Sequence, residues 1–510
     1  MTPIITGDRS IHVRLAQGVN LSLETHFWRW AAFFLSLSAA FWLTADLRIK
    51  MWYDELITLY IAKQSSFADI IKAVADGSDG QPPLYAMIVH LILPVVKDEA
   101  LAVRLPATLG YCGMVLGLLA FCHRRFSATY SFIAAMAAYI MTVSYAIDGR
   151  AYGIVLGCAA GAMLCWQMAA EDRHRRIVIP MLALCLATMV AMHYYAIFFL
   201  VPLFFAEMAR RQETGKLDLD ILAAMSPALI VLGLHYPFIK VAQQLFQIHF
   251  WAHASLDNIR SYYMPSIFIP LLLLSIAFGA TVLFPKMAPG VVRVSTMPLH
   301  EWVAVGVLEL MPFIVIILSI YSTHIFDDRY VLWTIIGYAV LTGALLFKGL
   351  RGNIAIGVIL FVVMGSIIIQ KEISLLLNTP FQHKAGEIYR ELERLPDNPE
   401  LVVVPHPSIF LYLSYYAKPA VRTRLIYPVN RDMDVRYLGF DTDAILLSRL
   451  SRRAPIRVEE YQAIVAENSH FLLILTPEDY LLKQLAASGY RSVLLQSGVF
   501  SAIYEVERLK

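Results

Sequence analysis

Acidic residues that could do chemistry are concentrated between residues 48 and 100. Asp54 and Glu55 are adjacent and directly follow the first long apolar segment, residues 27–47, and Asp79 comes three residues before a Pro-Pro pair. Proline is favoured at the first turn of a helix, so these acids are expected in an ordered loop on a membrane surface. A carboxylate there could accept a proton from a substrate. The alternatives are a solvated interfacial loop, and a helix-capping role for Asp54.

Other polar residues that could bind a substrate lie at the ends of apolar segments. Arg150 and Tyr152 are equally typical of a pair that anchors a helix end at the lipid headgroups, and His193 and Tyr194 could belong to an aromatic belt. A single histidine on an apolar helix, such as His90, is more often packed than a ligand. The candidates are Gln81, Tyr85, His90, Arg104, Asp148, Arg150, Tyr152, His193, Tyr194, His253, Arg260, Arg329 and Tyr330.

The composition excludes a soluble globular protein. Of 510 residues, 58% are hydrophobic and only 16% are charged, which is typical of a chain that crosses a membrane many times. The net charge of +3 argues against a nucleic-acid partner. The five cysteines lie in or beside apolar segments without metal-ligand spacing, so packing roles are expected.

Apolar segments of suitable length predict about eleven transmembrane helices. The segment 83–96 is too short to cross a hydrocarbon core of about 30 Å. It is expected on the outer surface, after two amphipathic runs at 54–63 and 66–76. The predicted spans are residues 27–47, 101–121, 127–145, 151–170, 177–192, 195–209, 219–239, 264–284, 302–321, 330–347 and 353–370.

Positive residues orient these spans. If segment 83–96 stays outside, all five basic clusters fall on the side of the N-terminus, so the N-terminus is expected in the cytoplasm. These clusters are Arg124-Arg125, Arg173–Arg176, Arg210-Arg211, Lys286 with Arg293, and Lys348 with Arg351. All candidate chemical residues then lie on the outer face. A transporter would instead place ionisable groups near the bilayer midplane.

Arginine suits a phosphate group, because its planar guanidinium donates two parallel hydrogen bonds. Arg104, Arg260 and Arg329 are the external candidates, although the charge of Arg329 could be neutralised by the acids that precede it. The loop at 240–262 contains aromatic residues whose faces could contact a ligand, together with His253. Ordinary interfacial anchoring explains that loop equally well.

The composition changes after residue 370. Residues 371–510 contain alternating helix and strand signals, which predict a small α/β domain. Helices are expected near 381–394, 407–416 and 477–487, and strands at 401–405, 425–429, 471–476, 491–496 and 501–507. The segment has no glycine-rich phosphate motif, so a stabilising or acceptor-binding role is expected.

The order of these motifs over residues 27–347 resembles that of the GT-C glycosyltransferases. The resemblance is to the branch that contains the protein O-mannosyltransferases and the lipid A aminoarabinose transferases, particularly bacterial members. The residues that carry it are Asp54-Glu55, Asp79-Gly80-Gln81-Pro82-Pro83-Leu84-Tyr85 with His90, Arg104-Leu105-Pro106, Ala146-Ile147-Asp148-Gly149-Arg150-Ala151-Tyr152, His193-Tyr194-Tyr195 and Asp328-Arg329-Tyr330.

This resemblance implies a polyprenyl-phosphate sugar as the donor and a glycan, lipid or protein of the cell envelope as the acceptor. It implies Asp54 as the general base, with Glu55 as second choice, and Asp148 as a second carboxylate that faces the same cavity. A divalent metal would be held by Asp54, Asp79 and His90. The aminoarabinose branch has Glu-Lys directly before its Pro-Pro pair, where this chain has Gly80 and Gln81, so metal dependence is doubtful.

The sequence therefore predicts a polytopic α-helical membrane glycosyltransferase of GT-C type with a C-terminal extracytoplasmic α/β domain. The expected division is a cytoplasmic tail at 1–26, a catalytic transmembrane domain at 27–370 and a periplasmic domain at 371–510, in a bacterial inner membrane. Displacement by direct attack would invert the anomeric centre. The alternative functions are a flippase or transporter of lipid-linked sugar, and a non-catalytic assembly subunit.

The topology leads to a first prediction. A cysteine introduced near Lys97 should react with an impermeant thiol reagent in intact cells, whereas one introduced near Arg125 should not, because only the first site faces outward. The measurement is labelling above that of the parent protein. Labelling at Arg125 alone would contradict both the number of spans and the shared outer face.

Overall fold

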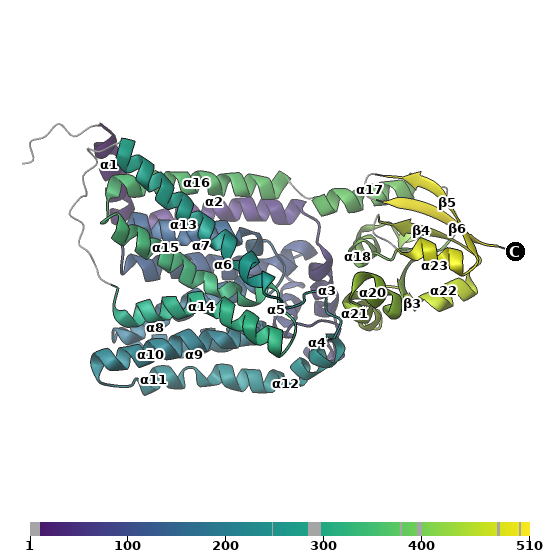
Figure 1. Ribbon diagram of the computed structural model, residues 1–510, viewed down its shortest axis with the longest axis horizontal. Helices are drawn as coiled ribbons and strands as arrows, with labels where there is room; N and C mark the ends of the chain where they lie inside the picture. The colour runs from purple at the N-terminus through teal and green to yellow at the C-terminus, as the bar shows by residue number, and fades with distance from the viewer. Residues whose placement is uncertain are drawn as a thin grey trace, which may run out of the picture.

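The computed structural model describes residues 11–246, 248–283, 297–377, 380–394, 400–476, 480–498 and 501–509. A bundle of long helices forms one end of the molecule, and a domain of short helices and strands forms the other (Figure 1). The predicted cluster of Lys286 with Arg293 lies outside the described residues, as do residues 1–10 of the expected tail. Residues 11–25 form helix α1 (Ile11–Thr25), which packs against the bundle.

Within the described residues, ten helical segments are long and apolar enough to cross a membrane. They comprise α2 (Phe27–Arg48), α6 (Glu99–His123), α7 (Ala128–Thr142) with η1 (Val143–Ala146), α8 (Tyr152–Ala170), α9 (Arg175–Met192), α11 (Leu219–Ala223) with α12 (Ser226–Phe246), α13 (Asp257–Leu283), α14 (Leu299–Tyr321), η3 (Asp328–Thr334) with α15 (Ile335–Gly349), and α16 (Ile354–Leu377). The described part of the chain therefore confirms a polytopic α-helical fold.

The predicted span 195–209 is the one that differs. Its first residues form a 3-10 helix, η2 (Tyr194–Phe199), and only the following α10 (Leu200–Thr214) is α-helical. Fifteen α-helical residues rise about 22 Å, which is less than the hydrocarbon core. The segment nevertheless runs beside α14 in the bundle, and η2 supplies the missing length.

Helices α6 and α8 approach each other closely along a stripe of glycines. A Cβ at Gly153 would lie 2.2 Å from the carbonyl oxygen of Ala107, and one at Gly157 would lie 2.2 Å from that of Gly110. Contacts this short mean that only glycine allows the two backbones to touch. The approach matters for the site, because α6 carries Arg104 and the chain enters α8 just after Arg150.

Three short helices fill the loop between α2 and α6, as expected from the amphipathic runs. They are α3 (Tyr53–Ala62), α4 (Phe67–Ala75) and α5 (Leu84–Ile92). The nine residues of α5 span only about 14 Å, so the segment at 83–96 cannot cross a bilayer. Ser66 caps α4 by accepting a hydrogen bond from the backbone amide of Asp69, which explains where that helix starts.

The C-terminal domain is a mixed α/β fold around a six-stranded sheet of order β3-β2-β1-β4-β6-β5. The first four strands in that order are parallel, and β6 runs antiparallel to both β4 and β5. Parallel strands joined by helices require cover on both faces, which the surrounding helices provide. The strands are β1 (Val402–Val403), β2 (Leu425–Val429), β3 (Val458–Glu460), β4 (His470–Leu475), β5 (Tyr490–Ser497) and β6 (Ala502–Arg508).

The helices of this domain were only partly predicted. Those expected near 381–394, 407–416 and 477–487 correspond to α17 (Pro380–Arg394), α18 (Pro407–Tyr416) and α23 (Leu481–Ala487), although residues 477–479 lie outside the described chain. The sequence analysis did not predict β3 or four short helices, because none of these elements is longer than nine residues and so none has a clear periodic pattern. The missed helices are α19 (Pro419–Arg422), α20 (Arg431–Leu438), α21 (Thr442–Leu450) and α22 (Tyr461–Glu467).

The C-terminal domain contacts the loops at the end of the helical bundle. The backbone amide of Met51 donates a hydrogen bond of 2.8 Å to the Tyr416 hydroxyl. The backbone amide of Asp441 and the hydroxyl of Thr442 both donate to the carbonyl oxygen of His249, over 3.3 and 3.2 Å. The domain therefore lies over α3 and over the loop before α13, where the candidate residues are found.

The glycine stripe leads to the second prediction. Gly153→Ala should lower the melting temperature of the purified protein, because its Cβ must displace the backbone of α6; overpacking of this kind typically costs about 1–3 kcal/mol. Gly113→Ala on α6 is the matched control, since its Cβ would lie an ordinary 3.7 Å from Gly157. Equal melting temperatures for the two variants would show that the helices can separate without cost.

Candidate active site

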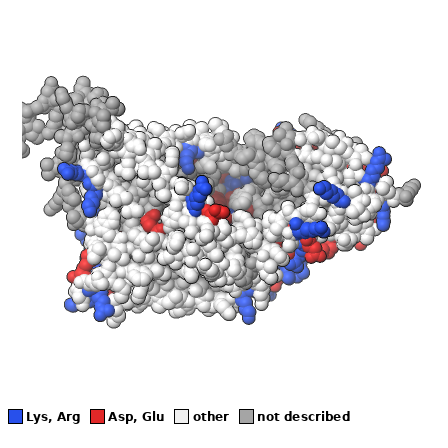
Figure 2. Space-filling model, in the orientation of Figure 1, with Lys and Arg blue, Asp and Glu red and all other residues white. Residues whose placement is uncertain are grey.

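The centre of the candidate site is the ion pair between Asp54 and Arg329. Asp54 lies in the first turn of α3, and Arg329 lies in η3, far away in sequence. Arg329 Nη1 lies 3.4 Å from Asp54 Oδ2, and the two side chains are 21% and 22% exposed, respectively. This is the only hydrogen bond that the Asp54 carboxylate receives within the described residues. Acidic and basic side chains gather in a hollow between the bundle and the C-terminal domain (Figure 2).

Arg329 is shared between two acids. Its Nε donates a hydrogen bond of 2.9 Å to Asp327 Oδ1, and Nη2 lies 3.3 Å from Asp327 Oδ2. The guanidinium also lies 5.8 Å from the ring of Tyr152 and 5.7 Å from that of Trp251. The two aromatic rings and the two hydrogen bonds to Asp327 hold the guanidinium group in place, so that its Nη1 is directed toward Asp54.

The contacts of Glu55 indicate a structural role, and they leave it unsuited to act as a general base. It is completely buried, and both of its oxygens accept hydrogen bonds from Arg104, over 2.6 and 2.7 Å. The backbone amides of Trp52 and Gly149 donate to the same carboxylate. A Cβ at Gly149 would lie 2.9 Å from Glu55 Oε1, so glycine is required at this contact. No lone pair of Glu55 points into open space.

Arg104 is likewise unsuited to bind a substrate phosphate. Its remaining N–H groups donate to the carbonyl oxygens of Asp46, Ile49 and Lys50, so all five donors have protein partners. The side chain is 2% exposed. The expectation that Arg104 binds phosphate is therefore corrected: it holds the end of α2 against the start of α3.

Asp79 forms a fork with Arg150. Nη1 and Nη2 of Arg150 donate to the two Asp79 oxygens over 2.9 and 3.1 Å, and Nη1 also donates to the Thr58 hydroxyl. The side chains of Arg150 and Asp79 are only 7% and 13% exposed. Gln81 donates to the Tyr152 hydroxyl over 3.0 Å. This group forms one wall beside Asp54.

Asp148 is a second carboxylate near Asp54. The only hydrogen bond that its side-chain carboxylate accepts within the described chain comes from the Trp52 indole N–H, over 3.2 Å. Burial, together with the charges of Glu55 and Asp54, raises the pKa of Asp148 from 3.8 to about 7. Burial also raises the pKa of Asp54, opposed by Arg150 and Arg329. Both carboxylates are therefore more basic than an exposed aspartate, as a proton acceptor requires.

Aromatic rings form the floor of the site. The ring of His193 lies 5.8 Å from Tyr152 and 5.2 Å from Tyr330, measured between centroids, and Tyr195 lies 4.9 Å from Tyr330. Burial and the nearby arginines lower the pKa of His193 to about 3, so its imidazole is neutral. The floor consequently adds no charge, and neutral faces of this kind can contact a sugar ring.

The C-terminal domain contributes an acid that no sequence motif indicated. Asp443, in α21, lies beside Tyr53 and near Asp54, and burial raises its pKa to about 6. It comes from a domain in which no catalytic cluster was expected. The indole of Trp52 was also missed, since it belongs to no recognisable motif. Asp327, in contrast, had been considered as a partner that could neutralise Arg329, and it does pair with Arg329.

Several predicted residues lie apart from the centre. The Tyr85 hydroxyl donates to the Val103 carbonyl, and the Tyr194 ring packs against His235. His253 is exposed and forms an isolated β-bridge with Ile325. Arg260 is exposed on α13 and has no hydrogen bond or ion pair in the described part of the chain, so its charge is available to a ligand.

The predicted metal ligands are not brought together. His90 Nδ1 lies 2.8 Å from the carbonyl oxygen of Ala62, and Asp79 is engaged by Arg150. Among the described residues, the single group with metal-ligand spacing lies elsewhere, in the C-terminal domain. Asp54, Asp79 and His90 do not fit a shared divalent ion in this arrangement.

Five aspartates and two arginines thus lie around one partly open point at the end of a membrane helical bundle that carries an α/β domain. The long helices and the mixed α/β sheet together form a fold that occurs in solved structures. Two crystal structures share it: ArnT from Cupriavidus metallidurans bound to undecaprenyl phosphate, and the same protein in its apo state. The TM-scores are 0.55 and 0.52, each at 12% identity, over 93% of this chain and 98% and 97% of theirs. The expected fold is confirmed.

Comparison of sequences alone does not detect this structural likeness. No protein-family model matches the chain, and no curated protein matches it. At 12% identity the likeness describes the fold, and it does not assign residue roles.

The raised pKa of Asp148 leads to the third prediction. The folded protein keeps this proton up to about pH 7, whereas the unfolded chain loses it near pH 4. Ionisation of Asp148 therefore lowers the stability of the parent as pH rises between these values. Asp148→Asn should remove this loss, so its melting temperature should fall less than that of the parent between pH 5 and pH 8. An identical pH dependence of the melting temperature in parent and variant would contradict this prediction, because it would mean that Asp148 is solvated and has an ordinary pKa.

Proposed function

We propose that this chain is a membrane glycosyltransferase that moves a sugar from a polyprenyl-phosphate carrier to an acceptor hydroxyl group. The observation that carries the proposal is the pair of Asp54 and Arg329, which places a proton acceptor and a permanent cation 3.4 Å apart at a partly open point. Further support comes from the shared fold with ArnT, which has been crystallised with undecaprenyl phosphate. A bundle of membrane helices gives the carrier's isoprenoid tail access from the lipid.

Asp54 acts as the general base in this proposal. One of its oxygens accepts no hydrogen bond within the described residues, so it can receive one from the acceptor. As the acceptor oxygen attacks the anomeric carbon, its proton passes to Asp54, and the bond to the phosphate oxygen breaks. Polyprenyl phosphate leaves with the bonding electrons. A single displacement of this kind inverts the anomeric centre.

Arg329 stabilises the departing phosphate. Charge develops on the leaving oxygen as the glycosidic bond breaks, and a fixed cation in a poorly hydrated site lowers the energy of that state. Asp327 holds Nε of Arg329, which leaves Nη1 for the ligand once Asp54 has taken up a proton. Arg260 lies apart from this pair, but it is exposed on α13 and has no ion-pair partner among the described residues, so it is proposed as a second cation for the carrier phosphate.

Asp148 holds the acceptor. With a pKa of about 7 it exchanges readily between a donor and an acceptor of hydrogen bonds. The acceptor is a glycan, lipid or protein of the cell envelope. In the proposed arrangement the site and the C-terminal domain face the periplasm from a bacterial inner membrane, and the N-terminus is cytoplasmic.

The role of Asp54 supplies the fourth prediction. Asp54→Asn should reduce turnover by at least about 100-fold, the usual effect of one positioned base, while protein yield and binding of the carrier lipid are retained. The assay is transfer of a labelled sugar by purified protein in detergent or liposomes. Asp172→Asn is the matched control, because that carboxylate is 84% exposed. Parent protein that moves lipid-linked sugar across liposomes without transferring it would identify a transporter.

The role of Arg329 supplies the fifth prediction. Arg329→Ala should nearly abolish sugar transfer, whereas Arg329→Lys should retain part of the transfer activity. Lysine keeps the positive charge but lacks the planar guanidinium that donates two parallel hydrogen bonds. Since Asp327 also depends on Arg329, melting temperature and activity per folded molecule must be measured together. A destabilised Arg329→Ala that is fully active would mean that Arg329 only neutralises Asp327.

A further inference from the structure

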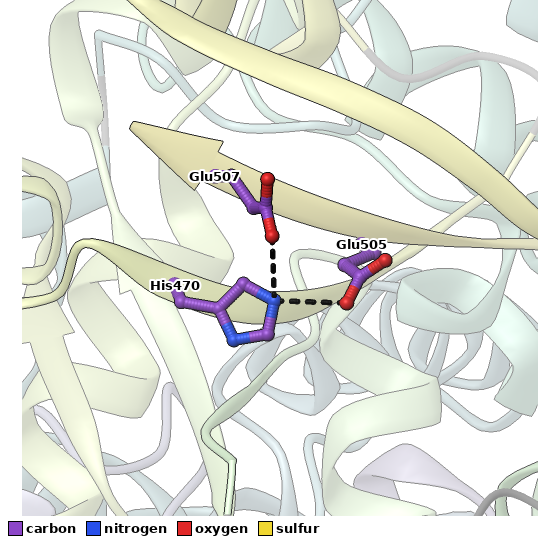
Figure 3. A group of neighbouring side chains, drawn as sticks. All are labelled: His470, Glu505 and Glu507. Carbon is purple, nitrogen blue, oxygen red and sulfur yellow. Dashed lines mark hydrogen bonds and ion pairs between the residues drawn. The ribbon is translucent and has the colours of Figure 1, made fainter. Parts of the chain in front are cut away.

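A second cluster of chemically active side chains lies on the sheet of the C-terminal domain. His470, at the start of β4, pairs directly with Glu507 of β6. Glu505 lies two residues earlier on β6, and side chains two apart in a strand project from the same face. The imidazole therefore lies between two carboxylates of the neighbouring strand (Figure 3).

The distances within this cluster match a metal site. His470 Nε2 lies 3.0 Å from Glu505 Oε1 and 3.7 Å from Glu507 Oε1, and the three atoms lie within 4.8 Å of one another. A tetrahedral Zn²⁺ with bonds of about 2.1 Å separates its ligand atoms by roughly 3.4 Å. The observed separations lie on either side of that value, so a small side-chain adjustment would bring all three atoms to one ion.

A fourth residue orients the imidazole. Glu400 Oε1, just before β1, lies 3.3 Å from His470 Nδ1. Histidines that bind metals generally donate their second ring N–H to a carboxylate, which places the lone pair on the other nitrogen. Here that other nitrogen is Nε2, the atom between Glu505 and Glu507.

We propose that His470, Glu505 and Glu507 bind a divalent transition-metal ion of the Zn²⁺ type, with Glu400 orienting His470. The imidazole ligand selects Zn²⁺ over Ca²⁺ or Mg²⁺, which prefer oxygen ligands alone. The side chains of the three ligands are 30%, 35% and 59% exposed, so an ion can enter and water can complete its coordination. Three glutamates around one histidine leave excess negative charge, which a cation neutralises even though Arg491 lies opposite Glu507 on β5.

This ion would have a structural role. It would join β6, the last strand of the described chain, to β4 in the middle of the sheet. The cluster belongs to the sheet, whereas the contacts with Asp54 are made from α21. The inference is therefore independent of the proposed transferase activity.

The test is binding of Zn²⁺ to the full-length protein in detergent, by calorimetry and by melting temperature. The parent should bind one more equivalent of Zn²⁺ than Glu507→Gln, and saturation should raise the melting temperature of the parent by several degrees but not that of the variant. Glu507→Gln removes one ligand while it keeps the pair of His470 and Glu505, so the variant should fold. Glu467→Gln, another exposed glutamate, is the control and should behave as the parent.

Two results would overturn the proposal. One is the same Zn²⁺ stoichiometry in the parent and in Glu507→Gln. The other is a melting temperature of the parent that does not respond to Zn²⁺, which would mean that protonated His470 is simply an ion-pair partner of the glutamates. Stabilisation of the parent by Ca²⁺ to the same extent as by Zn²⁺ would also exclude a site that depends on the imidazole. Sugar transfer should be unchanged in Glu507→Gln.

Discussion

The buried ion pair between Arg104 and Glu55 is the interaction on which the rest of the site depends. It joins α6, the chain that leaves α2, the first turn of α3 and the loop at Gly149, all through hydrogen bonds to two side chains. Removal of one member of such a pair typically costs about 3–5 kcal/mol, because the other is left buried and uncompensated. This arrangement also determines the position of Asp54, since Asp54 is the neighbour of Glu55 and its backbone is held in the same helical turn.

The site is assembled from both parts of the molecule. The membrane helices supply Asp54, Asp148 and Arg329 through their loops, while the C-terminal domain supplies Asp443 and covers the loop at His249. Carboxylates outnumber arginines around the centre, and burial has raised the pKa of several of them. Proton uptake therefore balances part of the negative charge before any anionic ligand arrives.

The sequence predicted the positions of helices and strands better than it predicted which side chains pair with each other. Apolar runs located the spans, and β2 was placed correctly at residues 425–429, because both signals are local. Asp54, Asp148 and Arg329 were expected on one face; in the structure Arg329 lies 3.4 Å from Asp54, and the charge of Asp54 acts on Asp148. The partners of Arg104 and Arg150 lie 49 and 71 residues away, and nothing in the local pattern reveals that these arginines are already satisfied. Asp443 could not be predicted either, since no local pattern marks it and only the packing of the C-terminal domain brings it to α3.

The location of Arg104 also bears on how the protein is made. Arg104 lies near the N-terminal end of α6, and an unpaired arginine within a membrane segment costs up to about 2.5–3.5 kcal/mol during insertion. Glu55 and the carbonyl groups after α2 neutralise this cost, but all of them belong to chain that is synthesised earlier. The first loop is therefore synthesised before the arginine that pairs with its Glu55. The pair can form only once α6 has been made, so it joins α6 to the chain around α3 after both have been synthesised.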